Sequence, residues 1–313
     1  MSHFERALEL AELGRGKVAD HPLVGAVVVR DAEVVGEGWY EYANVEHAES
    51  IALAQAGESA RGATLYVTLE PCNHHGRTPP CSLTVIEAGI ARVVIGARDP
   101  NAKAAGGIET LLDAGVTVEL LDDRRAIVQN EAWRTWKSLG RPFVTHKVAV
   151  SLDGRVLVPG RRWVSGDESR RRVHELRAAS DAVAVGMGTV RADNPRLDAR
   201  DVGAVRQPRR LAFGHGESEL EVRSGPLEEE LRALAAEGVQ SLLLEGGPTL
   251  ATAFFRAGLV DKLLLFIAPV ISGAGPRWVG DVSLRLTDVT ATTIGEDVLV
   301  EAYPVADVHR DRP

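Results

Sequence analysis

Only two of the 313 residues are cysteines, and both of them, Cys72 and Cys81, fall within one short segment. So low a cysteine content excludes a scaffold held together by several disulfides, the means by which many small secreted domains are stabilised. Nothing in this cysteine usage indicates an oxidising compartment, and we therefore expect a cytoplasmic protein.

The chain also has little that would direct it to nucleic acids or membranes. Its net charge is −8, whereas a general nucleic-acid binder needs an excess of Lys and Arg to neutralise phosphates. The longest apolar run, 263–271, is too short for a membrane span and contains Pro269. The first residues lack the basic and then apolar order of a signal peptide. With 45% hydrophobic and 26% charged residues, the sequence predicts a soluble globular protein of one large domain or two ordinary ones.

The cysteine segment carries the strongest sign of chemistry. His47-Ala48-Glu49 opens a helical pattern, and Cys72 and Cys81 follow in a polar, proline-rich stretch. One imidazole and two thiolates give zinc three protein ligands and leave its fourth position open, as in catalytic zinc sites. Glu49 stands two residues from the first ligand, where a carboxylate could carry a proton from water to a leaving amine. The alternative, two structural cysteines or a disulfide beside an unrelated histidine, does not explain the combined order of these residues.

The first half alternates strand and helix patterns, which predicts a three-layer α/β domain. Strands are expected at 24–30, 34–40, 63–69, 92–97 and 116–121, and helices at 2–13, 47–56, 81–87 and 107–114. The zinc ligands then fall at helix N-termini, where the positive end of the macrodipole stabilises a thiolate. A single amphipathic helix at 122–138, with Trp133 and Trp136 as packing residues, leads to the domain boundary at Gly140-Arg141-Pro142.

The second half repeats the alternation, with strands expected at 143–150, 181–186, 210–213, 240–245, 261–268, 288–293 and 297–302 and helices at 167–179, 225–237 and 248–257. Gly246-Gly247 opens the last helix, where backbone N–H groups could bind an anion or simply form a turn. The Arg170-Arg171-Arg172 run is expected to be a solvated face. Arg177 suits either a substrate phosphate or a surface salt bridge.

The order His-x-Glu, then Pro-Cys, then Cys is the signature of zinc-dependent nucleobase deaminases, in which the Glu is not a ligand. Two residues usually separate the cysteines of that signature, whereas eight separate Cys72 from Cys81. The insert, Asn-His-His-Gly-Arg-Thr-Pro-Pro at 73–80, closely resembles that of the bifunctional deaminase-reductases of riboflavin biosynthesis. The second half resembles the reductase domain of the same enzymes through motifs in the same order: Lys147, Ser-Leu-Asp-Gly at 151–154, Trp163-Val164-Ser165, Thr189 with Asp193, Pro195 and Leu197, and Glu245-Gly246-Gly247.

This resemblance covers essentially the whole chain. It implies an α/β protein with a three-layer cytidine-deaminase-like domain at 1–140 and a dihydrofolate-reductase-like α/β domain at 141–313. The implied activity is zinc-dependent deamination of a diaminohydroxyphosphoribosylaminopyrimidine, followed by NADPH-dependent reduction of its ribosyl side chain to ribityl. A homo-oligomer is compatible with this architecture.

The resemblance also implies roles for individual residues. Zinc would be held by His47, Cys72 and Cys81, with Glu49 as the catalytic proton shuttle. The implied NADPH-site residues are Val150, Trp163, Thr189, Asp193 and Gly247, and the implied substrate-binding residues are Arg177, Leu197, Arg200 and Glu245.

Four departures from the family pattern leave alternatives open. His21 replaces an Asn that contacts the pyrimidine, and Tyr40 stands where a His is common. No basic residue stands between Gly106 and Gly107, so a phosphate contact is missing there, and the 213–240 segment is short. The alternatives are a deaminase with a degenerate reductase domain and a deaminase with a shifted aminopyrimidine substrate. Two further alternatives are a nucleic-acid-editing deaminase, which the acidic charge disfavours, and a zinc-binding module without catalysis.

Overall fold

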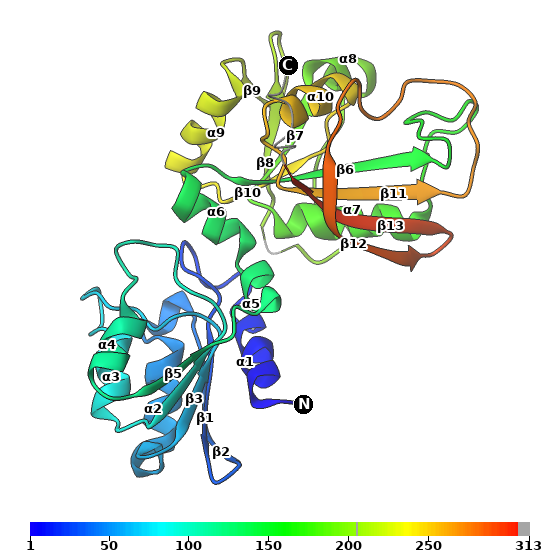
Figure 1. Cartoon of the computed structure of the whole chain (residues 1–313). Coiled ribbons are helices and arrows are strands. Elements are labelled where there is room, and N and C mark those ends of the chain that lie inside the picture. Colours follow the sequence, from blue (N-terminus) through cyan, green and yellow to red (C-terminus); the bar gives the residue numbers. More distant parts are fainter. Residues whose placement is uncertain (205, 306–313) are drawn as a thin grey trace, which may run out of the picture. The chain divides into compact units, whose positions relative to one another are not determined.

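The structure is a computed structural model that describes residues 1–204 and 206–305 (Figure 1). The chain divides into two compact units, Met1–Leu139 and Gly140–Pro313. No helix among the described residues is both long and apolar enough to cross a membrane.

The first unit is built on a five-stranded sheet in the order β2-β1-β3-β4-β5. Strand β1 pairs antiparallel with β2 and β3, whereas β3, β4 and β5 are parallel. The strands are β1 (Gly25–Arg30), β2 (Glu33–Trp39), β3 (Thr64–Val67), β4 (Arg92–Ile95) and β5 (Thr117–Leu120).

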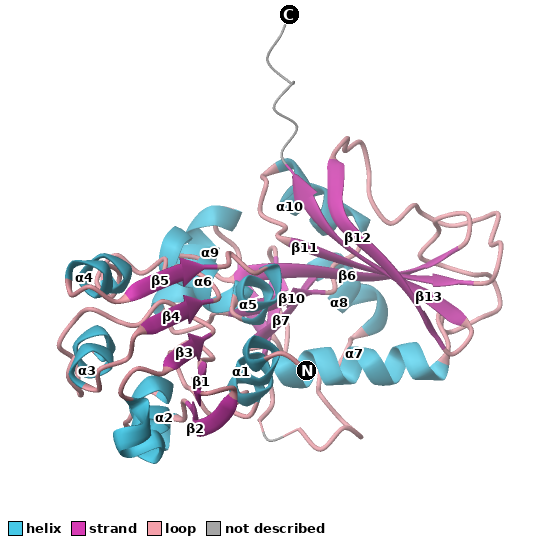
Figure 2. Ribbon diagram, turned by 60° about the horizontal axis from the view of Figure 1, so that its bottom comes forward, coloured by secondary structure: helices cyan, strands magenta, loops and turns pink. Residues whose placement is uncertain are grey.

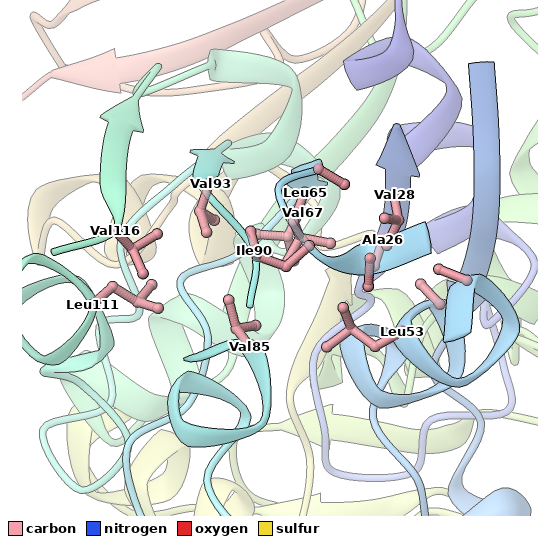
Figure 3. Close-up of a cluster of buried hydrophobic side chains, with 14 of the residues drawn as sticks. Ala26, Val28, Leu53, Leu65, Val67, Val85, Ile90, Val93, Leu111 and Val116 are labelled. Carbon is pink, nitrogen blue, oxygen red and sulfur yellow. The ribbon is translucent and has the colours of Figure 1, made fainter. Parts of the chain in front are cut away.

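Helices cover both faces of this sheet, because alternate residues of a strand point to opposite sides. Ala26 and Val28 of β1 belong to the hydrophobic cluster that α2, α3 and α4 close (Figure 3), while Val27 and Val29 pack against α1 on the other face. The helices are α1 (His3–Glu12), α2 (Ala48–Ala56), α3 (Cys81–Glu87), α4 (Gly107–Asp113), α5 (Arg124–Gln129) and α6 (Glu131–Leu139), with 3-10 turns η1 (Tyr42–Asn44) and η2 (Gly57–Ala60). The predicted three-layer arrangement is confirmed.

The predicted single helix at 122–138 is wrong, since α5 and α6 are separated at Asn130. The side-chain amide of Asn130 donates to the backbone oxygen of Leu23 and accepts from its N–H, both at 2.8 Å. Asn130 is buried, and this pairing fixes the start of α6 against the segment that enters β1.

The second unit has an eight-stranded mixed sheet in the order β12-β13-β11-β6-β10-β7-β8-β9. Six neighbouring strands of this sheet are parallel: β11, β6, β10, β7, β8 and β9. Strand β13 pairs antiparallel with β11, and β12 pairs antiparallel with β13 at the edge. The strands are β6 (Phe143–Ser151), β7 (Ala182–Gly186), β8 (Arg209–Phe213), β9 (Glu221–Arg223), β10 (Ser241–Leu244), β11 (Lys262–Ala268), β12 (Arg285–Ile294) and β13 (Asp297–Val305). The sequence pattern missed β9, which has three residues and no apolar run.

Helices again cover both faces of the sheet (Figure 2). Val173 of α7 packs with Leu264 and Phe266, whereas Leu231 of α9 and Phe254 of α10 belong to a cluster on the opposite face. The helices are α7 (Asp167–Ala179), α8 (Met187–Asp193), α9 (Leu227–Ala236) and α10 (Pro248–Arg256). The second half is therefore the α/β unit that the sequence predicts.

Candidate functional site

The three predicted zinc ligands come together in the first unit. Nδ1 of His47 and Sγ of Cys72 and Cys81 all lie within 4.8 Å of one another. Nδ1 of His47 is 3.1 Å from Sγ of Cys81 and 3.5 Å from Sγ of Cys72. Tetrahedral zinc with Zn–N of about 2.0 Å and Zn–S of about 2.3 Å separates such donors by about 3.6 Å, so this donor set fits zinc.

Two of these three side chains lie at helix N-termini. His47 is the N-cap residue of α2, and Cys81 is the first residue of α3. The prediction is wrong for Cys72, which lies in the loop between β3 and α3. The backbone N–H of Cys81 nevertheless donates to Sγ of Cys72 at 3.4 Å, so the N-terminus of α3 still stabilises that sulfur.

The thiols of the cluster differ in acidity. Hydrogen bonding by Cys81, assisted by His47, outweighs burial and lowers the pKa of Cys72 to about 4. The same contact with Cys72, together with burial, raises the pKa of Cys81. Cys72 is therefore the more acidic of the two thiols, and the thiolate is the form that binds a metal.

Glu49 lies beside the cluster, on the first helical turn of α2. It is only 4% exposed, and burial raises the pKa of its carboxyl to about 7. A carboxyl with a pKa near the working pH can both accept and donate a proton.

His47, Glu49 and Cys72 line a cavity of about 240 Å³ in the first unit. His21 and Tyr40, two of the departures from the family pattern, lie on its wall. The Tyr40 ring stands edge-on to His47, with centroids 5.5 Å apart, and the His21 ring lies 5.2 Å from Tyr40. Both departures therefore lie on the wall of the cavity that His47 and Cys72 also line.

Sequence reasoning missed Glu70, a buried residue of the same wall. Its carboxylate accepts hydrogen bonds from the backbone N–H groups of Asp99 at 3.1 Å, Gly106 at 3.1 Å and Ile108 at 3.2 Å. Glu70 therefore ties the loop before α4 to the segment that carries Cys72. The only sequence signal for it was a charged residue at the end of an apolar strand pattern.

A second cavity, of about 840 Å³, lies in the second unit. Seven of the nine residues predicted to bind NADPH or substrate line it: Trp163, Arg177, Thr189, Asp193, Arg200, Glu245 and Gly247. Val150 and Leu197 do not, because both are only 2% exposed and their side chains pack in hydrophobic clusters behind the wall. Gly247 is the N-cap residue of α10.

The wall also carries two basic residues, Arg170 and Lys147, that the sequence did not predict to bind a ligand. Arg170 was expected on a solvated face, but it lines the cavity, donates to the Ser165 carbonyl at 2.9 Å and lies over the Trp163 ring. Lys147 lies 3.5 Å from Glu245, which also pairs with Arg177. Burial alone would raise the pKa of the Glu245 carboxyl. The positive charges of Lys147 and Arg177 outweigh burial, so the net effect is a lowered pKa.

Comparisons with known proteins match both units. The cytidine and deoxycytidylate deaminase zinc-binding region matches residues 1–97, and the RibD C-terminal domain matches residues 142–300. Riboflavin biosynthesis protein RibD of Aquifex aeolicus is 37% identical, with 96% of this chain and 97% of that protein covered. The protein of the same name from Escherichia coli is 36% identical, with 88% and 89% covered.

Solved structures agree. The crystal structure of a diaminohydroxyphosphoribosylaminopyrimidine deaminase/5-amino-6-(5-phosphoribosylamino)uracil reductase from Thermotoga maritima has a TM-score of 0.82 at 34% identity, covering 96% of this chain and 97% of that one. Acinetobacter baumannii RibD has a TM-score of 0.81 at 33% identity, covering 96% and 98%. With such identity over nearly its whole length, this chain belongs to the RibD family of riboflavin biosynthesis proteins.

Proposed function

We propose that this protein catalyses two successive reactions of riboflavin biosynthesis. The first unit deaminates a diaminohydroxyphosphoribosylaminopyrimidine, and the second reduces the ribosyl side chain of the product to ribityl with NADPH. The observation that carries the proposal is the convergence of His47, Cys72 and Cys81 beside buried Glu49 in a chain of this family.

In the first unit, His47, Cys72 and Cys81 would hold zinc, which acts as a Lewis acid and makes water a better nucleophile at neutral pH. Glu49 takes a proton from the water that attacks the amine-bearing ring carbon. It then delivers that proton to the leaving nitrogen, the C–N bond breaks, and ammonia departs. Burial of Glu49 keeps its pKa high enough for both transfers.

In the second unit, bound NADPH would supply the hydride, and the residues of the cavity would hold its nicotinamide against the sugar carbon. The cavity volume lies in the upper part of the range for small-molecule sites, and its wall carries Arg200, Arg170 and Lys147 for negatively charged groups. We propose that Trp163, Thr189, Asp193 and Gly247 contact NADPH, while Arg177, Arg200 and Glu245 serve the substrate. For the side chains of Val150 and Leu197 we propose no direct ligand contact.

The alternative of a degenerate second unit finds no support in these features. A cavity with ordered charged side chains is retained, and the RibD C-terminal domain model matches residues 142–300. We also propose that the protein works in the cytoplasm, because metal binding requires Cys72 and Cys81 to stay reduced.

Mass spectrometry of the products tests the two activities separately. The zinc-loaded protein is incubated with the diaminopyrimidinone ribosyl phosphate, with and without NADPH. Loss of the amino group without NADPH, and gain of two hydrogens with it, is the expected result. Deamination without reduction would refute the second activity, and no reaction would refute both.

A further inference from the structure

Helix α6 contributes two side chains to the deaminase cavity, although the sequence marked it only as a connector. Trp133 and Lys137 both lie on the cavity wall. They stand four residues apart, so they project from the same face of the helix. The match to the deaminase zinc-binding region ends at residue 97, so this face lies outside the part of the chain to which that model applies.

The indole of Trp133 is buried with an unused donor. The residue is 5% exposed, and its Nε1 has no hydrogen-bond partner among the described residues. The Nε1 atom is itself buried, so Trp133 contributes its ring, not an accessible donor, to the cavity wall.

Lys137 supplies positive charge to the same wall. It is the one Lys or Arg on that wall in the described part of the first unit, and it forms no ion pair there. Its Nζ lies 4.1 Å from the centre of the Trp136 ring. Lys137 also stands in the last turn of α6, where a cation complements the helix dipole, but that role does not require it to line a cavity.

The α6 end of the cavity wall differs in charge from the rest of the wall. Asp20, Glu49, Glu70 and Asp99 are carboxylic side chains, so an anionic group of a ligand is repelled from most of the lining. Lys137 offers the complementary charge at α6.

We propose that this face of α6 binds the phosphoribosyl group of the deaminase substrate. Lys137 pairs with the phosphate, and the Trp133 ring forms the neighbouring part of the wall. This inference rests on the proposed function and names the residue that would take over the phosphate contact missing beside Gly106-Gly107.

The test compares K137M with the control K103M in the full-length protein. Lys103 is exposed and does not line the cavity, so its loss removes the same charge elsewhere in the unit. Deamination is measured with the phosphorylated substrate and with its dephosphorylated form. K137M should raise KM for the phosphorylated substrate about 10- to 100-fold, with kcat nearly unchanged, because a hydrogen bond to a charged group is lost.

For the dephosphorylated substrate, K137M and the unaltered protein should have the same KM. Equal KM increases for both substrates, or a K103M effect as large as that of K137M, would overturn the proposal.

Binding of ribose 5-phosphate, followed by calorimetry, gives a readout that does not depend on turnover. K137M should weaken the binding at least about tenfold relative to K103M. Unchanged ribose 5-phosphate binding in K137M would refute the α6 site even if deamination is observed. Weakened binding without any deamination would instead refute the proposed reaction while leaving the anion site in place.

Discussion

Arg177 and Glu245 form a bidentate salt bridge on the wall of the second cavity. Nε and Nη2 of Arg177 lie 2.6 Å and 3.0 Å from the two carboxylate oxygens of Glu245. The side chains are only 14% and 9% exposed. The sequence left a surface salt bridge and a phosphate contact open for Arg177. The pair that forms is a buried one, and it fixes the guanidinium and the carboxylate of the cavity in one arrangement.

Replacing Glu245 with Gln should damage both stability and reduction in the second unit. The change leaves Arg177 and Lys147 without their carboxylate, and breaking a buried pair costs about 3 to 5 kcal/mol. We expect a lower free energy of unfolding and loss of NADPH oxidation, while deamination by the first unit persists. Urea titration and a coupled absorbance assay measure these effects.

Glu228→Gln is the matched control, since Glu228 is 58% exposed and pairs with Arg232 on the surface of α9. An E245Q protein as stable as E228Q would contradict the structural importance of the pair.

Replacing Glu49 with Gln should abolish deamination and leave metal binding intact. The amide cannot carry the proton, yet it occupies nearly the same volume in the buried position. We expect deamination to fall by about 100-fold or more, since general acid–base catalysis contributes about 10²- to 10⁴-fold. Product formation and zinc content are measured on the same sample. Glu46→Gln, an exposed neighbour three residues earlier, should retain full activity. Undiminished deamination in E49Q would remove Glu49 from the mechanism.

Removing the metal should separate the two activities. Treatment with a chelator, or the Cys81→Ser substitution, leaves too few ligands for a three-residue zinc site. Zinc content near zero and no deamination are expected, and added zinc should restore the chelated protein but not C81S. Reduction of the independently prepared deaminated product should continue in both. A metal-free protein that still deaminates would show that the cluster has another role.

The sequence predicted those features that depend on local pattern or on residue chemistry. Strand and helix periods gave the layers of both units, and the rarity of cysteine made the ligand set conspicuous. What it missed depends on partners distant in the chain. Asn130 divides a helix by bonding Leu23, 107 positions away, and Arg177 finds Glu245 68 positions away. The place of Arg170 on a cavity wall likewise depends on the fold of the Trp163 loop, which helical periodicity does not describe.

His146 should make the second unit sensitive to acid. It is completely buried on β6, between Phe255 and Trp278, and burial lowers its pKa from 6.5 to about 4. Above pH 6.5 neither the folded nor the unfolded state binds the proton, so the residue has no effect on pH dependence. Between pH 6.5 and about 4 only the unfolded state binds it, and the free energy of unfolding falls by about 3 kcal/mol in total.

Urea titrations at pH 7 and pH 5 measure this effect. His146→Leu should lose less stability between the two pH values than the unaltered protein does. His215→Gln changes an exposed histidine and should behave like the unaltered protein. An identical loss of stability in H146L would assign the acid sensitivity to other groups.

Replacing Gly107 with Ala should weaken the metal site without touching a ligand. Gly107 is the first residue of α4, and a Cβ placed on it would lie 1.9 Å from the backbone oxygen of Pro71, the residue before Cys72. Such a contact forces Pro71 to move and displaces Sγ of Cys72 from His47 and Cys81. Disturbed support of a ligand lowers metal affinity by about 10- to 100-fold, and we expect a loss of that size in chelator competition.

Gly76→Ala, in the loop that carries Cys72, is the control. The nearest atom to a Cβ placed on Gly76 belongs to His74 and is 3.5 Å away, which leaves room for a methyl group. If G107A binds zinc as tightly as G76A, close packing at Pro71 does not set the position of Cys72, and the glycines at 106–107 would need another explanation.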